Sequence, residues 1–298
     1  MNLLKRLWGI LLYTAKRISA QKGLTLAIIF GFTVAASLTM SIPIYADAAN
    51  QKILEADVLS ETGEVASSAP TSSFSFMFRY VGSWYGKVGW EKVQPVDTYL
   101  TEQGILDLGL PLQQLVRFFR SDSFPFVSAD TEIYSGSEYF PLAWVSIATL
   151  SSWDEHVEIV EGISPAASPP AASGETNIWV NEELATEIGL QPGETYRLLA
   201  KFNDDQQNVV ITVRIAGIWA ITDLSDPYWF YKPADFRYVL FATEQDFFQS
   251  VLPVINNEID LALWYMLMDK SAVHSSDVPS LVNRISKTRT RAGVYLPH

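Results

Sequence analysis

The 298-residue sequence contains no cysteine, which excludes a disulfide framework, a thiolate metal site and a cysteine nucleophile. Charged residues make up only 18% of the chain, and 21 basic residues stand against 33 acidic ones. The acidic excess is uneven, because residues 1–50 hold five basic side chains and one acidic side chain. Nucleic-acid binding needs a basic surface, so we expect no nucleic-acid partner for the acidic remainder of the chain.

Motifs that carry chemistry are also scarce. The three histidines, His156, His274 and His298, all lie more than four residues apart, unlike the short spacings of zinc ligands. A nucleophile elbow of the G-x-S-x-G type is absent. The segment 82–88 has a Gly-Lys pair without the glycine spacing or the following Ser/Thr of a phosphate-binding loop. We therefore expect no enzymatic activity, no catalytic residue, no metal site and no cofactor.

A long hydrophobic run without charge is present once, at residues 23–45. These 23 residues would form a helix of about 35 Å, enough for a hydrocarbon core of about 30 Å. Basic residues precede the run and acidic residues follow it. The positive-inside rule then predicts a cytoplasmic basic interfacial helix at 1–22 and an extracytoplasmic body at 46–298, attached to the plasma membrane. The lipid bilayer is thus an expected partner.

A cleaved signal peptide is the alternative interpretation of this segment. Ala46-Asp47-Ala48 has the small-residue pattern of a cleavage site. The apolar run is longer than the 7–15 residues of a signal-peptide core, which favours an uncleaved anchor. Within the run, Ala27, Gly31 and Ala35 recur every fourth residue and predict a face on which another membrane helix packs.

Several elements are predicted outside the membrane segment. We expect a helical continuation at 50–58, a weakly strand-like aromatic stretch at 76–90, and a helix at 111–120 from the spacing of its apolar residues. An apolar run at 141–150 predicts a buried strand, and 164–174 reads as a loop. Near the end, Asp277 precedes a predicted helix with Leu281, Val282 and Ile285 on one side and a basic tail.

Four consecutive aromatic residues stand out in the part of the chain after the membrane segment. They are Tyr228, Trp229, Phe230 and Tyr231. They cannot all face one core if they lie in a strand, so we expect a partly exposed aromatic surface that a hydrophobic ligand, the lipid surface or a partner covers. Packing against both faces of a strand is the alternative.

The clearest local pattern runs from residue 177 to residue 219. It predicts a strand at 178–180, a helix at 182–188 capped by Asn181 and closed by Gly189, and a turn at 191–194. A strand at 196–202, a polar hairpin loop at 203–208 and a strand at 209–219 complete the unit. In the last strand, alternation places Val209, Ile211, Val213, Ile215 and Trp219 on one face.

The stretch WVNEELATEIGLQPGETYRL followed by VVITVRIAGIW resembles the extracytoplasmic core domain of MacB-like and FtsX-like ABC transporter permeases. The basic lead, the span and SIPIYADAANQKIL resemble the N-terminal arrangement of the same family. The resemblance implies an α+β fold, with one N-terminal transmembrane helix followed by a mixed α+β extracytoplasmic domain in two lobes. It also implies a cytoplasmic ABC ATPase subunit, other permease spans or a second permease copy as partners.

Members of this family continue with three further spans, which this sequence does not reach before His298. We therefore expect the N-terminal part of a permease, either a fragment of a longer frame or a truncated product, that handles a hydrophobic or lipid-linked substrate or transmits force. A single-span sensor or solute-binding module without an ATPase is the alternative, and a secreted hydrolase released at Ala48 is a third.

Overall fold

The computed structural model describes residues 20–60, 74–130, 140–172, 174–201, 208–269 and 277–295, together with Trp8, Tyr13, Lys16 and Val273. The chain consists of two compact units, residues 1–57 and 58–298. Residues 203–207 of the predicted hairpin loop at 203–208, and most of the predicted interfacial helix at 1–22, lie outside the described residues.

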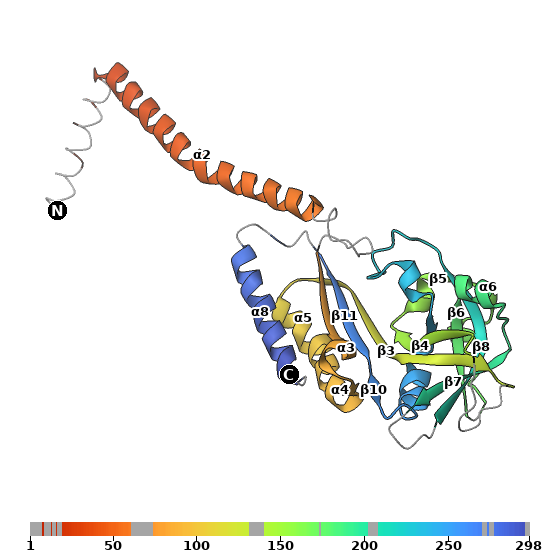
Figure 1. Ribbon diagram of the computed structural model, residues 1–298. Helices are drawn as coiled ribbons and strands as arrows, with labels where there is room; N and C mark the ends of the chain where they lie inside the picture. The colour runs from red at the N-terminus through yellow and green to blue at the C-terminus, as the bar shows by residue number, and fades with distance from the viewer. Residues whose placement is uncertain are drawn as a thin grey trace. The chain divides into compact units, whose positions relative to one another are not determined.

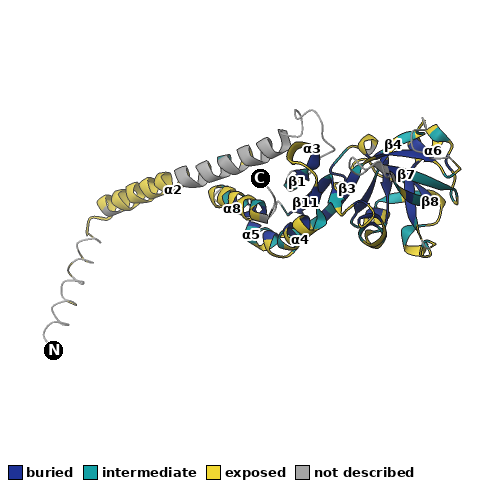
Figure 2. Ribbon diagram, turned by 60° about the horizontal axis from the view of Figure 1, so that its bottom comes forward, coloured by how far each residue is buried: buried dark blue, intermediate teal, exposed yellow. Residues whose placement is uncertain are grey.

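Helix α2 (Lys22–Ser60) is continuous over 39 residues, as Figure 1 shows. Its part from Lys22 to Ser41 is long and apolar enough to cross a membrane, and it is the one such helix among the described residues. The described side chains of this part are exposed, coloured yellow in Figure 2. The helical continuation expected at 50–58 is confirmed, because α2 runs on beyond its apolar part.

The second unit is built on a large sheet, which confirms the mixed α+β class. Among the described residues the sheet has nine strands, in the order β1–β11–β3–β4–β9–β6–β8–β5, and β7 pairs with both β3 and β8. Their bounds are β1 Ser75–Val81, β3 Leu112–Ser128, β4 Ala143–Leu150, β5 Val157–Gly162, β6 Glu175–Asn181, β7 Thr195–Lys201, β8 Asn208–Ile221, β9 Val239–Phe241 and β11 Leu261–Met268. A small second sheet joins β2 (Val88–Gly89) to β10 (Glu258–Ile259).

Helices cover parts of this sheet (Figure 1). They are α3 Gly82–Tyr85, α4 Trp90–Thr98, the π-helix η2 Tyr99–Gly104, α5 Ile105–Leu108, α6 Glu182–Ile188, α7 Glu244–Asp246, the π-helix η6 Phe247–Val251 and α8 Val278–Tyr295. Short 3₁₀ turns occur at Trp153–Glu155, Pro165–Ala167 and Pro233–Phe236. The stretch 76–90, predicted to be strand-like, is therefore strand only in β1 and β2 and helical at Gly82–Tyr85 and from Trp90, whereas β4 agrees with the predicted buried strand.

The long strand β3 links two halves of the sheet. Its first part pairs with β11, and its last part pairs with β4 and β7. The pairings of β3, β4, β9, β6, β8 and β7 close into a ring. β1 and β11 extend the sheet away from this ring, so one continuous sheet runs through residues 58–298, which form a single compact unit. The expected division into two lobes stays a prediction.

The helix predicted at 111–120 is wrong, because this segment forms the first half of β3. Leu115 and Phe119 pack into one hydrophobic cluster, whereas Val116 and Phe118 are buried in the other. A central strand with both faces buried reads as a nearly continuous apolar run, which matches helical spacing over a few residues. The neighbouring strands β11 and β4 decide the outcome.

The predicted pattern at 177–219 is largely confirmed. The Asn181 side chain accepts a hydrogen bond of 2.9 Å from the Glu183 backbone N–H, and Gly189 ends α6 with φ of 80°. Trp219, however, lies on the opposite face from Ile215. The pairing with β6 skips Ala216, since Ile178 faces Ile215 but Trp179 faces Gly217. This extra residue is a β-bulge, which shifts the alternation by one position.

Two hydrophobic clusters lie on the two faces of the sheet. Figure 2 colours the buried residues of the chain, which include the core of both clusters, dark blue. The larger lies under α4, η2, α6 and η6, and the smaller is dominated by aromatic side chains. Tyr228, Trp229 and Phe230 belong to the aromatic cluster and are each only 1% exposed, while Tyr231 is half-buried. The expected exposed aromatic surface at 228–231 is therefore wrong, because an irregular segment folds these side chains back onto the sheet.

Candidate functional site

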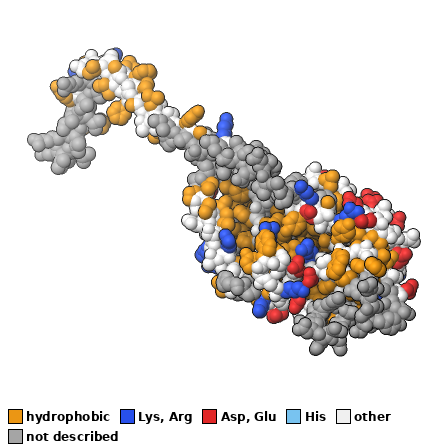
Figure 3. Space-filling model, in the orientation of Figure 1, with side chains coloured by type: hydrophobic (Ala, Val, Ile, Leu, Met, Phe, Trp, Pro, Cys, Tyr) orange, Lys and Arg blue, Asp and Glu red, His pale blue; other side chains and the backbone are white. Residues whose placement is uncertain are grey.

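A groove of about 540 Å³ lies between the edge strand β1 and helix α8. Strand β1 supplies five consecutive residues of its lining, α3 one, β11 one, the α4–η2 segment two and α8 four. The lining residues are Phe76, Met77, Phe78, Arg79, Tyr80, Tyr85, Val96, Leu100, Trp264, Ile285, Arg289, Ala292 and Gly293. In Figure 3, hydrophobic side chains gather on the surface beside α8. A groove that is mostly apolar with a few polar groups is the usual form of a binding site.

The groove is positively charged although the whole chain carries a net charge of −12. Arg79 and Arg289 are its charged lining residues, and no Asp or Glu side chain lines it. Both side chains are exposed. The Arg79 guanidinium carbon lies 5.0 Å from the ring centroid of Trp84, a cation–π contact that leaves its hydrogen-bond donors available.

The outer edge of β1 has no strand beside it among the described residues, since β1 is the terminal strand of the sheet and pairs only with β11. The Gly82 N–H donates to Asp260 and the Met268 N–H donates to the Phe74 carbonyl. Because inward and outward backbone groups alternate along an antiparallel strand, the N–H and C=O groups of Ser75, Met77 and Arg79 point outward.

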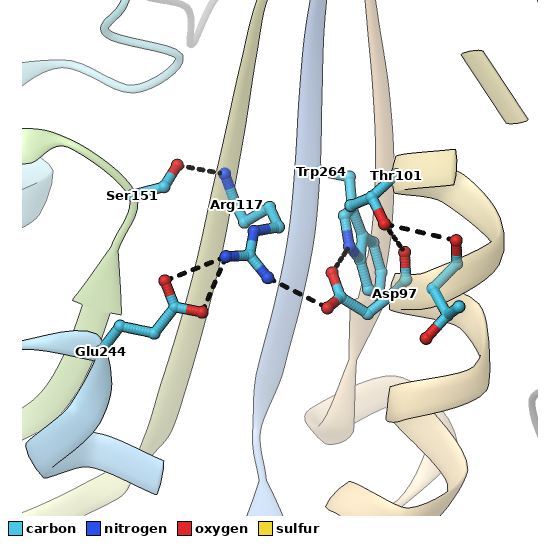
Figure 4. A network of polar contacts seen from close by, with 7 residues as sticks. Asp97, Thr101, Arg117, Ser151, Glu244 and Trp264 are labelled. Atoms are coloured by element: carbon cyan, nitrogen blue, oxygen red, sulfur yellow. Dashed lines mark hydrogen bonds and ion pairs between the residues drawn. The ribbon is translucent and has the colours of Figure 1, made fainter. Parts of the chain in front are cut away.

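A polar network fixes one wall and the floor of the groove (Figure 4). Arg117, on β3, donates to Asp97 Oδ2 of α4 at 3.1 Å and to both carboxylate oxygens of Glu244 at 2.7 and 2.9 Å. Asp97 Oδ1 accepts a 2.8 Å hydrogen bond from the Trp264 indole N–H. The carboxylate therefore orients the indole that lines the groove and attaches α4 to the sheet.

A second set of contacts holds α8 in place. Asp107 Oδ2 accepts hydrogen bonds from the Tyr99 hydroxyl at 2.7 Å and from Arg291 Nη1 at 2.5 Å. Both hydrogen bonds stabilise the charged carboxylate and so lower the pKa of Asp107. The bond from Tyr99 has the larger effect and the bond from Arg291 the second largest. Arg284 adds a 3.3 Å hydrogen bond to the Gly109 carbonyl. α8 is thus tied to η2 and α5 while its other side borders the groove.

His156 forms a histidine–carboxylate pair, a contact that also occurs in catalytic sites. Its Nδ1 lies 2.6 Å from Asp226 Oδ2, and its ring stacks on Tyr228 at 3.7 Å between centroids. The contact at Nε2 is the Gln114 side-chain amide, 3.5 Å away, which is not a nucleophile. Burial is the main reason that the pKa of Tyr228 is strongly raised, so its hydroxyl stays protonated and donates to the Ser151 carbonyl. The His156–Asp226 contact and the Tyr228–Ser151 hydrogen bond therefore hold the 226–231 segment against the chain between β4 and β5.

The other candidate residues from the sequence have separate positions. Ala27, Gly31 and Ala35 are exposed on α2, and a Cβ at Gly31 would meet no atom within 4 Å. The packing face stays a prediction. His274 and His298 lie outside the described residues. Within the described part of the chain, no group of three His, Asp or Glu side chains is placed to hold a metal ion.

The sequence did not predict the groove. Its aromatic side chains stood out as a cluster, but the pairing of β1 with β11, 180 or more residues further along, places β1 at the sheet edge. The basic residues of the last helix were visible, and only the packing of α8 shows that Arg289 is the one that lines the groove.

No family model matches the chain, and no curated protein matches it. Among solved structures, the chain is similar to a domain of a protein from Porphyromonas gingivalis that is assigned as a permease. The sequence identity is 14% and the TM-score is 0.35, and the match covers 64% of this chain and 75% of the other. At this level the likeness carries no conclusion about function.

Proposed function

We propose that this chain is the N-terminal part of an ABC transporter permease subunit. In this proposal α2 crosses the plasma membrane once, with the N-terminus in the cytoplasm. The folded unit stands outside, where it handles a hydrophobic or lipid-linked substrate or transmits force. A cytoplasmic ATPase, which this chain reaches through the rest of the permease, supplies the energy. The chain itself breaks no bond and needs no cofactor.

The observation that carries the proposal is the continuity of α2. Its uncharged apolar part is followed by further helix to Ser60 without interruption. A continuous helix of 39 residues is about 58 Å long, longer than the bilayer core by more than 20 Å. Such a helix is suited to carry movement between a membrane segment and residues outside, and the resemblance of 1–60 and 177–219 to MacB-like permeases supports this role.

Co-purification tests the ATPase partner. The protein, expressed in its native cell with a C-terminal tag and extracted in mild detergent, should bring down an ATPase with a phosphate-binding loop. A variant with Leu26 and Ile29 changed to Asp should fail to insert and serves as the control for specificity. Recovery of the tagged protein at full yield without any ATPase would favour the single-span sensor or solute-binding module instead.

Protease treatment tests the orientation separately. Trypsin added outside spheroplasts should cleave the folded unit at its many exposed Lys and Arg residues, while a cytoplasmic marker stays intact. Protection of the folded unit until the membrane is permeabilised would reverse the orientation and contradict the proposal. A mature N-terminus at Ala49 would instead support the secreted form.

A further inference from the structure

The groove between β1 and α8 combines three features that a particular kind of ligand would use. It exposes outward backbone groups along β1, it has apolar side chains beside them, and it carries two guanidinium groups without an acidic neighbour in its lining. We propose that this groove binds an extended acidic peptide segment of a partner protein, which pairs with β1 as an additional strand.

The edge strand is unprotected in its composition. Natural proteins shield exposed edges with proline, bulges, inward charges or very short strands. β1 reads SFMFRYV, seven residues without proline or glycine and with one charge, Arg79. Its pairing with β11 is regular from Ser75 to Val81, so no bulge turns the edge away. An edge of this kind is a template for another strand.

The position of helix α8 beside the β1 edge favours the addition of one extended peptide over the docking of a complete second sheet. α8 borders the groove along its length through Ile285, Arg289 and Ala292. A peptide that adds to an edge strand beside a helix gains affinity from main-chain hydrogen bonds and specificity from pockets for alternate side chains. Phe76, Phe78 and Trp264 form the apolar surface for those side chains. A second copy of the whole sheet would have to approach past α8.

Charge selects the composition of the peptide. Arg79 lies on the strand side of the groove and Arg289 on the helix side. The described ion pairs of the chain involve neither side chain. Two guanidinium groups in an otherwise acidic protein favour a ligand with carboxylates at its ends. A hydrocarbon chain would fill the apolar surface but would leave the outward N–H and C=O groups of β1 unpaired, which favours a peptide over a lipid.

The test uses the full-length protein in detergent micelles. The probe is a fluorescein-labelled ten-residue peptide of alternating Val and Thr with Glu at both ends, and binding is read by fluorescence anisotropy. We expect saturable binding of this peptide. Its affinity should fall at least tenfold when the central backbone amides of the peptide are N-methylated, since methylation removes their N–H donors but keeps the side chains and the charge. This comparison leaves the protein unchanged, so it does not depend on the folding of any variant.

Protein variants locate the binding site. Met77→Pro removes one outward donor while proline remains tolerable at an edge position whose N–H faces solvent, and we expect it to abolish binding. Arg289→Gln should weaken binding roughly five- to tenfold through the lost charge-assisted hydrogen bond. Lys287→Gln, on the same helix but outside the groove lining, is the matched control and should change binding less than about twofold.

Three results would overturn the inference. Equal binding of the methylated peptide would exclude strand pairing. A site for amphipathic anions would give a different set of results. Arg289→Gln would lose binding, N-methylation of the peptide would have no effect, and a lysophospholipid would compete with the peptide. A dimer in light scattering that Met77→Pro dissociates would show that a second copy occupies the edge. The measurement needs no ATPase, so its failure is distinguishable from failure of the transport proposal.

Discussion

Asp97 and Arg117 lie 20 residues apart in the sequence, and in the fold Asp97 Oδ2 is 3.1 Å from Arg117 Nη1. The side chains are 13% and 26% exposed, so the pair is largely shielded from water. Asp97→Ala would leave the guanidinium with one partner fewer and the Trp264 indole N–H without its acceptor. We expect the free energy of unfolding to fall by about 2 kcal/mol.

Glu244→Ala is the matched control for this change, because it removes the other carboxylate that Arg117 contacts. The Glu244 side chain is 47% exposed, and solvent-exposed ion pairs contribute less than about 1 kcal/mol. Urea unfolding followed by tryptophan fluorescence measures both variants. Equal losses for Asp97→Ala and Glu244→Ala would show that the link to α4 and Trp264 has no special weight.

Gly162 and Gly174 allow the effect of crowding to be separated from that of backbone conformation. Both have positive φ, 89° and 84°. A Cβ at Gly162 would collide with the Ala216 carbonyl oxygen and lie 2.7 Å from Gly217 Cα, whereas a Cβ at Gly174 would meet nothing within 4 Å.

We therefore expect Gly174→Ala to cost about 1–2 kcal/mol from the left-handed backbone alone. Gly162→Ala should cost about 1–3 kcal/mol more, because the pairing of β5 with β8 has to open to admit the methyl group. Thermal unfolding of the two variants measures the difference. Similar melting temperatures would mean that β5 moves aside without loss.

Local sequence signals predicted the elements whose causes are local. The cap Asn181, the left-handed Gly189 and the turn at 191–194 depend on residues within a few positions of one another, and the structure has all three. The uncharged run of α2 is local in the same sense.

The predictions from sequence were wrong for elements whose environment is set by residues distant in the chain. The segment 111–120 has helical spacing, but β11 and β4 flank it and make it a central strand. Trp219 changed face because a bulge opposite β6 inserts Ala216. The groove depends on β1 being the last strand of the sheet, which follows from pairing with residues 261–267 and from no feature of β1 itself.

Tyr196 gives the protein an alkaline dependence of stability. Burial, together with the 2.8 Å hydrogen bond from its hydroxyl to Glu194 Oε2, raises the pKa of Tyr196 from 10.0 to about 12. In the unfolded chain the phenol ionises near its ordinary pKa of about 10. Its contribution to stability is therefore complete below pH 10 and is lost as the pH rises towards 12.

Tyr196→Phe removes this titration while it keeps the ring that stacks on Phe126. The stability difference between wild type and variant should thus be largest below pH 10 and shrink between pH 10 and pH 12. Urea unfolding of both proteins at pH 9, 10, 11 and 12 measures it, and the titration of all other groups cancels in the difference. A difference that stays constant over this range would mean that the folded and unfolded phenols share one pKa.

Gly31→Leu tests the packing face of α2. Ala27, Gly31 and Ala35 are exposed on the helix, and a Cβ added at position 31 meets no side chain and no other segment within 4 Å. Leucine raises the hydrophobicity of the segment, and membrane insertion should remain complete. If another helix approaches closely on this face, the branched side chain would force it away and weaken assembly with the membrane partners.

Phe32→Leu, one position further and on another side of the helix, is the control. Detergent extraction and pull-down should recover the partners with Phe32→Leu and lose most of them with Gly31→Leu, and equal recovery would place the contact, if there is one, elsewhere on α2.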